Sequence, residues 1–525
     1  MDAMRHETMI FLTGAAVLAL EVLASRIMTP YFGVSLFIWA GILSITLTFL
    51  AVGYYAGSAV SRRLTPDVLE LWYLGAPAVA AISIVIGALL YPVVFPLLTR
   101  MNLVVASFLG GALLLTAPLI ALSAMNPLLV AIQRSDHDAG DAGAGRVFFI
   151  STIGSVAGVL ITAFVFIPLM RNFTGILTIA MVLCGLVVTY ALRAPLTVRQ
   201  RSLLAAISIV AGLLAALLAW GQRGYLEVVT DDPGFDFAIE HEYTSVFGNI
   251  KVIKLQPRTA GAEPLLAFLQ DGLVQNRALE NGASLSLYTY FLEALAFAYM
   301  EDPKSALVLG LGAGIVPRNL GDEGLSVTAV EINRDSLLAA ETFFHFEPQN
   351  VAVEIEDART YVRHCDRKFD LAVVDLFNGD NTPDYLMTRE FFRDLASCMT
   401  EDGVMVVNAF FDQNDERPNQ RVRATVKSVF GELFEYRSPD GAAFLAATRR
   451  EGGEPRDLRP TRLPPFLRED FARAAANVRQ VGTRDIAGVP PITDDHNVFK
   501  VLFSDADRRL RRNLAEGLPV QFLVN

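Results

Sequence analysis

The first 220 or so residues contain apolar stretches that are too long for an ordinary soluble core. About seven of them reach the roughly 17 to 25 residues that a helix needs to cross a bilayer, namely 9–28, 36–57, 72–98, 103–132, 148–170, 174–192 and 203–220. The first stretch is long and is followed by others, which argues against a cleaved signal peptide. The sequence therefore predicts a multi-span α-helical membrane domain over residues 1–222, with seven or eight spans and the lipid bilayer as a partner.

Within these stretches, Glu21 and Arg26 are ionisable residues at bilayer depth. Such groups are costly there and usually face a partner, a cavity or the interface. A structural ion pair, an interfacial anchor and a role in ligand binding or transport all stay open. The small residues Gly154 and Gly158 are four apart, a spacing that indicates close packing between helices.

The remaining 300 residues have a different composition. Charged and proline residues return, and strand-like segments alternate with helix-like ones. The formal net charge of the chain is −11, which argues against a nucleic-acid partner. The three cysteines, Cys184, Cys365 and Cys398, show no paired spacing. We therefore expect neither a disulfide framework nor a metal site.

A glycine-rich turn follows an apolar run in this second half, at Gly310, Gly312 and Gly314. Glycines let the backbone approach a ligand closely, and a helix N-terminus after the turn favours negative charge. Glu331 ends the next apolar run, about 20 residues on, which is the spacing of a carboxylate that binds ribose hydroxyls. Glu331 as a solvated residue at a strand end is the alternative.

Two further strand-like runs end in acids, at Asp357, which precedes Ala358, and at Asp375. Ligands of open α/β sheets bind at the carboxyl ends of the strands. The pattern predicts a Rossmann-like, nucleoside-binding α/β domain over residues 291–525. Asp357 could instead only cap a helix, and Asp375 could lack a catalytic role.

A smaller unit precedes this domain. Apolar runs flank Asp271-Gly272, a dipeptide typical of a hairpin turn, and a helix-like segment with Tyr288 follows. We therefore expect a small β-unit with a linking helix over residues 223–290. Tyr288 as an ordinary packing residue is not excluded.

The order of these motifs resembles the spermidine synthase (aminopropyltransferase) family. The resemblance rests on Ser-x-Phe-Gly-Asn-Ile-x-Val at 245–252, Asp-Gly-x-x-Gln at 271–275, the tyrosine-bearing helix, the glycine turn and its three acids, and Thr-Asp-Asp at 493–495. The whole chain resembles the membrane-fused branch of that family. It implies a class I methyltransferase-type, spermidine synthase-like fold that follows a helical membrane region.

The resemblance also implies roles for single residues. The three glycines would line a sulfonium nucleoside, and Glu331 would hold its ribose. Asp357, with the amide of Ala358, would face the adenine edge. Asp375 and Tyr288 would be catalytic, beside the sulfonium and the incoming amine, and Gln275 would border the same site. The substrate would be S-adenosylmethionine or its decarboxylated form, and a homodimer is left open.

Two departures from the family concern acids that bind cationic amines. Ala313 stands where soluble members carry an acid in the turn, and Asn378 stands where they carry a second acid after the catalytic one, with Asp380 two residues further on. Aminopropyl-type transfer with release of methylthioadenosine is the leading interpretation. The alternatives are a lyase or cyclase that needs no second substrate, a methyltransferase, and a sensor or transporter that binds a nucleoside without turnover.

The orientation in the membrane follows from two conflicting arguments. Arginines are more numerous in the N-terminus and in the second, fourth and sixth links than in the others, which places the N-terminus in the cytoplasm. Seven spans would then place the second half outside. Because nucleoside cofactors are made in the cytoplasm, we expect the catalytic domain on the cytoplasmic side of the inner or plasma membrane.

Overall fold

The computed structural model describes residues 2–33, 36–136, 142–230, 234–259, 261–347, 350–377, 382–409, 411–438, 441–450, 455–458, 460 and 462–524. Its internal contacts divide the chain into two compact units. The first unit comprises Met1–Pro233 and Arg511–Asn525, and the second comprises Gly234–Leu510. This division does not test the domain boundaries expected after residues 222 and 290, which stay predictions.

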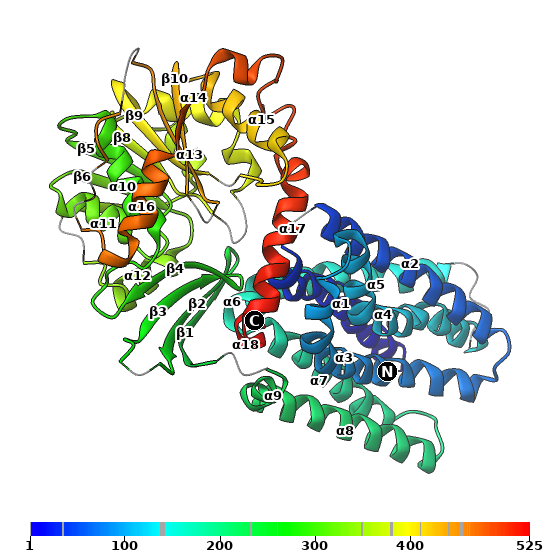
Figure 1. Cartoon of the computed structure of the whole chain (residues 1–525). Coiled ribbons are helices and arrows are strands. Elements are labelled where there is room, and N and C mark those ends of the chain that lie inside the picture. The colour runs from blue at the N-terminus through cyan, green and yellow to red at the C-terminus, as the bar shows by residue number, and fades with distance from the viewer. Residues whose placement is uncertain are drawn as a thin grey trace. The chain divides into compact units, whose positions relative to one another are not determined.

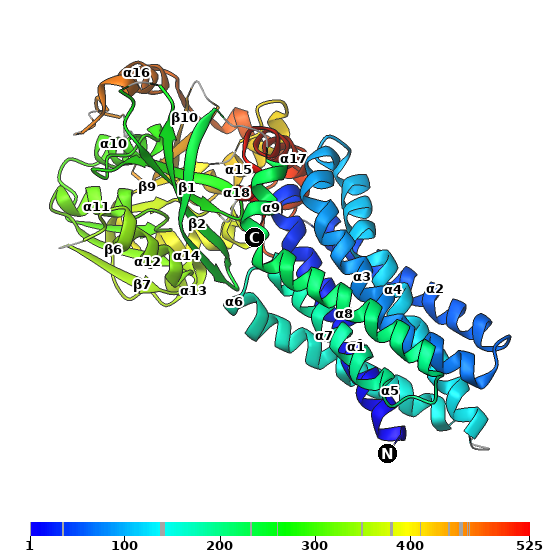
Figure 2. The ribbon, with the colours of Figure 1, turned by 90° about the horizontal axis from the view of Figure 1, so that it is seen from below.

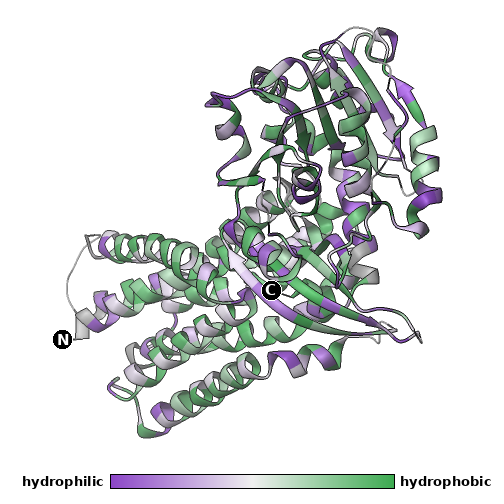
Figure 3. Ribbon diagram, turned by 90° about the vertical axis from the view of Figure 1, so that its left-hand side faces the viewer, coloured by the Kyte–Doolittle hydropathy of each residue, from purple (hydrophilic) through white to green (hydrophobic). Residues whose placement is uncertain are grey.

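The first unit is helical (Figures 1 and 2). Its long helices are α1 (Asp2–Phe32), α2 (Leu36–Ser61), α3 (Pro66–Leu98), α4 (Leu103–Asp136), α5 (Ala142–Ile161), α7 (Asn172–Ala191) and α8 (Val198–Trp220). A π-helical turn η1 (Thr162–Phe166) and α6 (Ile167–Leu169) extend α5, and α9 (Gln222–Val229) and α18 (Val520–Leu523) are short. Within the described residues, seven helices are long and apolar enough to cross a membrane, and hydrophobic residues predominate along them in Figure 3.

Glycines bring α1 and α5 into close contact. A Cβ atom on Gly154 would lie 2.0 Å from the carbonyl oxygen of Phe11, and one on Gly158 would lie 2.1 Å from that of Ala15. No side chain fits at these distances, so the two helices pack backbone against backbone. The interpretation of these glycines as packing residues is confirmed. Glu21 is buried among the helices, and its role stays open.

The second unit begins with a small antiparallel sheet of order β1-β2-β3-β4. Its strands are β1 (Phe235–Ser245), β2 (Gly248–Pro257), β3 (Leu265–Gln270) and β4 (Leu273–Leu279). Asp271 and Gly272 join β3 to β4 with φ angles of 47° and 78°. Two consecutive positive φ angles are those of the type I′ hairpin turn that Asp-Gly favours, so the predicted β-unit is present.

The helix α10 (Leu287–Tyr299) then leads into an eight-stranded sheet of order β12-β10-β11-β9-β8-β5-β6-β7. Its strands are β5 (Ser305–Leu309), β6 (Ser326–Glu331), β7 (Val351–Ile355), β8 (Phe369–Val374), β9 (Met399–Ala409), β10 (Glu432–Arg437), β11 (Ala443–Thr448) and β12 (Val478–Gln480). The helices that lie between these strands are α11 (Ile315–Asp322), α12 (Arg334–Phe343), α13 (Ala358–Arg363), η2 (Asp384–Leu386), α14 (Arg389–Ser397), α15 (Glu416–Lys427), η3 (Pro465–Leu467) and α16 (Arg468–Ala476). Two more follow the last strand, η4 (Thr483–Ile486) and α17 (Phe499–Gly517).

The order of this sheet reverses at β5, which pairs in parallel with β6 on one side and with β8 on the other. Such a reversal is the point at which open α/β sheets bind ligands. The antiparallel β11 lies between β9 and β10. The second half of the chain therefore has the predicted Rossmann-like fold.

Side chains on the two faces of the sheet enter two different cores. Along β8, Leu371 and Val373 pack in the core that contains Phe291 of α10. Ala372 and Val374 pack in the core that contains Phe391 of α14. Because both faces are covered, the central strands are continuous apolar runs, which is why they are recognisable in the sequence.

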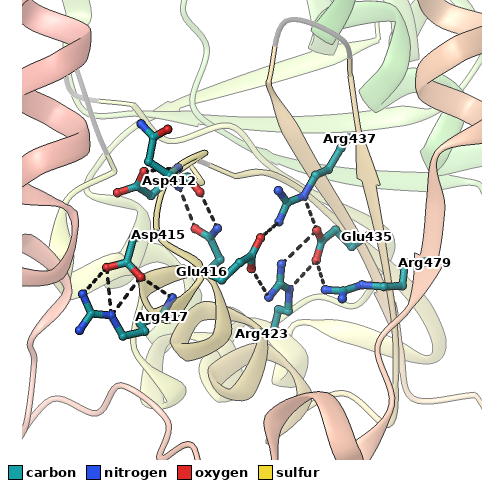
Figure 4. Close-up of polar contacts among 10 residues, drawn as sticks. Asp412, Asp415, Glu416, Arg417, Arg423, Glu435, Arg437 and Arg479 are labelled. Atoms are coloured by element: carbon teal, nitrogen blue, oxygen red, sulfur yellow. Dashed lines mark hydrogen bonds and ion pairs between the residues drawn. The ribbon is translucent and has the colours of Figure 1, made fainter.

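A buried ion pair fastens α15 to β10 (Figure 4). Arg423 Nε lies 2.5 Å from Glu435 Oε2, and the two side chains are 2% and 3% exposed. Although desolvation opposes it, the hydrogen bonds from Arg423 hold the pKa of Glu435 below its usual value. Arg437 and Arg479 also contact Glu435. A buried pair of this kind costs several kcal/mol to break on one side, so the network fixes the segment that follows the carboxyl end of β9.

Candidate active site

The glycine turn joins β5 to α11, and its glycines differ in what surrounds them. A Cβ atom on Gly310 would lie 2.1 Å from the carbonyl oxygen of Asp375, and one on Gly314 would lie 2.6 Å from the ring of Phe346. A Cβ atom on Gly312 would meet nothing within 4 Å. Gly310 and Gly314 therefore satisfy the packing of the fold, while Gly312 leaves open space beside the turn.

We expect Gly310→Ala to lower the melting temperature of the purified chain much more than Gly312→Ala. Both glycines have positive φ angles, of 96° and 53°, which costs an alanine about 1–2 kcal/mol. Only the first substitution also forces β5 away from β8. Thermal unfolding followed by circular dichroism measures the difference, and equal melting temperatures would contradict it. Gly312→Ala should act on nucleoside affinity instead.

Glu331 ends β6 and reaches back to the glycine turn. Its Oε2 accepts a hydrogen bond from the amide of Leu311 at 3.1 Å, and its Oε1 accepts one from the amide of Asn333 at 2.8 Å. Desolvation raises the pKa of Glu331, and these amides oppose the rise. The amides of Gly312 and Ile332 also face this carboxylate and help to lower its pKa. The binding of two ribose hydroxyls by Glu331 stays a prediction.

Asp375 follows β8 directly and is half-buried. Burial raises its pKa to about 6, while a hydrogen bond from Asn408 lowers it. Asn408 Nδ2 of β9 donates to Asp375 Oδ1 at 2.9 Å. Among the described residues, no arginine or lysine forms an ion pair with Asp375. Within the part of the chain that the structure describes, no basic side chain therefore neutralises this carboxylate.

Tyr288 stands on α10, near enough to Asp375 for the charge of that acid to act on its hydroxyl. Burial raises its pKa well above the usual value, and the nearby charge of Asp375 adds to the rise. Asn276 Nδ2 of β4 donates to the Tyr288 hydroxyl at 3.1 Å. The hydroxyl is therefore protonated at neutral pH and available as a donor.

Gln275 lies in β4, one residue before Asn276. The pairing with β3 shifts at this point, because Asn276 pairs with Phe268 while Val274 pairs with Leu269, so Gln275 is the extra residue of a bulge. Bulges re-aim a side chain and are frequent beside active sites. The role of Gln275 in the site stays a prediction.

Asp357 and Ala358 stand where β7 passes into α13. Asp357 Oδ1 accepts from the amide of Thr360 at 2.9 Å and caps the helix. Its Oδ2 accepts from the hydroxyl of Tyr385 at 2.8 Å. The amide of Ala358 is the first of the helix and needs an acceptor outside it. Asp357 therefore does cap the helix, as the alternative predicted. Its carboxylate can still accept a further hydrogen bond.

Two positions define the departures from the family pattern. Ala313 is buried in the glycine turn. Asn378 and Asp380 lie outside the described residues, so their surroundings are not compared. The binding and catalytic assignments made from the sequence stay predictions, although the sheet places the turn and its acids at the carboxyl edges of neighbouring strands.

Sequence reasoning missed several side chains that support these acids. They are Asn276, Asn408, Tyr385 and Arg359. Arg359 forms an ion pair with Asp494, which belongs to the Thr-Asp-Asp segment of the family resemblance. The partners are far apart in the chain, and only the position of Asn408 at the end of an apolar run signalled that it would reach the site.

The comparisons with known proteins agree with this fold. Residues 286–436 match the spermine/spermidine synthase domain. A polyamine aminopropyltransferase of Vibrio vulnificus is 34% identical over 143 residues, covering 26% of this chain and 47% of the relative. A probable polyamine aminopropyl transferase of Bifidobacterium longum is 27% identical over 197 residues, covering 37% and 42%. The chain thus spans less than half the length of these curated relatives.

A solved structure of a probable spermidine synthase from Corynebacterium glutamicum covers 49% of this chain and 97% of its own, with 17% identity and a TM-score of 0.40. The strand order and the glycine turn define a Rossmann-like domain of the spermidine synthase and methyltransferase type. The domain match over 286–436 and the curated relatives point more narrowly, to spermidine synthases and aminopropyltransferases. Residues 286–436 therefore carry a spermidine synthase domain, and homologues of the chain include polyamine aminopropyltransferases, so the resemblance is confirmed for this domain. The resemblance of the whole chain to a membrane-fused branch stays a prediction.

Proposed function

We propose that the protein is a membrane-anchored, aminopropyl-type transferase. Its second unit would bind a sulfonium nucleoside, transfer the aminoalkyl group to an amine and release methylthioadenosine. The observation that carries the proposal is Asp375, a half-buried carboxylate at the carboxyl end of β8 with no protein cation paired to it among the described residues. A sulfonium beside an amine supplies the positive charge that such a site favours. The aminopropyltransferase relatives support the same class of reaction.

The reaction balances without a further reagent. The neutral amine attacks the carbon next to the sulfonium, a C–N bond forms, and the C–S bond breaks with its electron pair moving to sulfur. Asp375 accepts the proton that the amine loses. Asn408 holds the carboxylate in place, and the protonated hydroxyl of Tyr288 adds a donor beside it. Glu331 and the glycine turn position the nucleoside.

The proton-accepting role gives a pH dependence. Because burial raises the pKa of Asp375 to about 6, kcat/KM should fall about tenfold per pH unit below that value, where the carboxyl group is protonated. Asn408→Leu removes a donor to the ionised form, which raises the pKa further. In a plot of kcat/KM against pH, measured with one acceptor amine in excess, we expect the activity of this variant to fall at a higher pH than that of the wild type. Coincident acid limbs would contradict the role of Asn408.

Ala313 favours one alternative, methyl transfer from intact S-adenosylmethionine. An acid at this position of the turn would repel the carboxylate of that substrate, and the buried alanine does not. The same residue leaves the aminopropyl amine of the decarboxylated form without one of its usual partners. The comparisons lend no support to the lyase or cyclase interpretation.

Product analysis separates these functions. Purified full-length protein is incubated with S-adenosylmethionine or with its decarboxylated form, with and without putrescine, and all products are identified by mass spectrometry. Methylthioadenosine together with an alkylated amine supports the proposal. S-adenosylhomocysteine would instead establish methyl transfer, and retained nucleoside binding without any product would favour a sensor. Asp402→Asn, an exposed position on β9, is the control for Asp375→Asn.

We also propose that the seven apolar helices anchor the protein in the inner or plasma membrane, with the second unit in the cytoplasm. The length and composition of these helices support the anchoring, and the cytoplasmic origin of nucleoside cofactors supports the side. Resistance of the chain to carbonate extraction would test the anchoring. Protection of the second unit from protease added outside intact cells, and its cleavage in inverted vesicles, would test the side.

A further inference from the structure

A chain of polar contacts runs from the C-terminal segment of the second unit to Asp357. Asp494 pairs with Arg359, Arg359 donates to the carbonyl oxygen of Tyr385, and the Tyr385 hydroxyl donates to Asp357. We propose that Tyr385, positioned by Arg359 and Asp494, is a specificity-determining residue that sets Asp357 to receive the amino group of a 6-aminopurine. The inference rests on the proposed function and deepens it.

The first step concerns the acceptor sites on Asp357. Its Oδ1 accepts from the amide of Thr360 at 2.9 Å and from the hydroxyl of the same residue at 3.1 Å. Its Oδ2 accepts from Tyr385 at 2.8 Å. Since a carboxylate offers about four acceptor sites, one remains, and it belongs to Oδ2. The direction of this last site is fixed by the hydroxyl of Tyr385.

The second step concerns the base that fits this arrangement. Asp357 offers an acceptor, and the first amide of α13, at Ala358, offers a donor. The 6-amino group and N1 of adenine present the complementary donor and acceptor. A 6-oxopurine presents an acceptor and an N–H at the same places, so both contacts would become mismatched. Sites built on such hydrogen bonds discriminate strongly, because a mismatch leaves polar groups unpaired.

The third step explains why Tyr385 needs positioning. The residue is 39% exposed, so packing alone does not hold its hydroxyl. Its backbone is held instead, because Arg359 Nη1 donates to the Tyr385 carbonyl oxygen at 2.7 Å. Arg359 is buried and uses its second nitrogen for Asp494. Asn497 adds a second tie by donating to the carbonyl oxygen of Asp384 at 2.8 Å. The C-terminal segment therefore fixes η2, and η2 orients the acid.

The experiment compares two nucleosides that differ only at the base. Isothermal titration calorimetry on the purified full-length protein measures the affinities of 5′-methylthioadenosine and 5′-methylthioinosine. We expect the wild type to prefer the adenine compound, and Tyr385→Phe to reduce that preference by about tenfold. Arg359→Lys keeps the charge, but the single ammonium group of lysine cannot bind both the Tyr385 carbonyl and Asp494 as the guanidinium does. This variant should therefore also reduce the preference for the adenine compound.

The control is Tyr361→Phe on α13, because within the described residues the hydroxyl of Tyr361 forms no hydrogen bond. This variant should keep the wild-type preference, and unchanged melting temperatures show that each variant is folded. An unchanged preference in Tyr385→Phe, or an equal loss in Tyr361→Phe, would overturn the inference while leaving the proposed function intact. Absence of binding of either nucleoside to the wild type would overturn both.

Discussion

Asp375→Asn is expected to abolish turnover while nucleoside binding persists. The substitution keeps the shape of the side chain and removes both its charge and its capacity to accept a proton. General-base catalysis contributes roughly 10²- to 10⁴-fold, so kcat should fall by at least that range. Binding should change little, because the proposed ribose site at Glu331 and the glycine turn is built on a different strand. The measurements are steady-state product formation and calorimetry with methylthioadenosine.

The control for this prediction is Asp402→Asn, which makes the same chemical change at an exposed position of β9. It should leave both quantities unchanged. A wild-type rate in Asp375→Asn would remove the general base from the mechanism and would leave alkyl transfer without a proton acceptor at the site. A parallel loss of binding and turnover would instead show that Asp375 holds the nucleoside.

The sequence predicts the architecture well because its signals are local. The apolar stretches exceed the length of a soluble helix, and the central strands are continuous apolar runs because the sheet is covered on both faces. Glycines with positive φ, such as Gly310 and Gly314, cannot be replaced without a clash or strain. Each of these features depends on only a few neighbouring residues. The glycine turn, the strands and the hairpin at Asp271 could therefore be located from the sequence.

The supporting shell of the site could not be predicted, because its contacts join distant segments. Asn408 of β9 meets Asp375 at the end of the neighbouring strand β8, 33 residues away in the chain, and Arg359 meets Asp494 across 135 residues. No spacing rule connects such pairs in a single sequence. The bulge at Gln275 depends on the pairing of two strands and not on composition. The sequence therefore located the acids, while the groups that set their direction and their pKa required the fold.

Glu331→Ala is expected to weaken the binding of methylthioadenosine by about tenfold or more. Hydrogen bonds from a neutral donor to a charged acceptor are worth roughly 1.5–3 kcal/mol, and two ribose hydroxyls would lose such an acceptor. The carboxylate also accepts from the amides of Leu311 and Asn333, so part of the loss would reflect a looser turn. Melting temperatures without nucleoside separate the two contributions, because only the second one acts on the free protein.

Glu354→Ala is the matched control, since this exposed acid pairs with Val330 from the neighbouring strand. It should bind methylthioadenosine as the wild type does. A comparison with 2′-deoxy and 3′-deoxy analogues makes the test specific. The wild type should lose affinity when either hydroxyl is missing, whereas Glu331→Ala should hardly distinguish the analogues from the parent nucleoside. If Glu331→Ala still discriminated among them as the wild type does, another group would hold the ribose, and the carboxylate at the end of β6 would serve only to fasten the glycine turn.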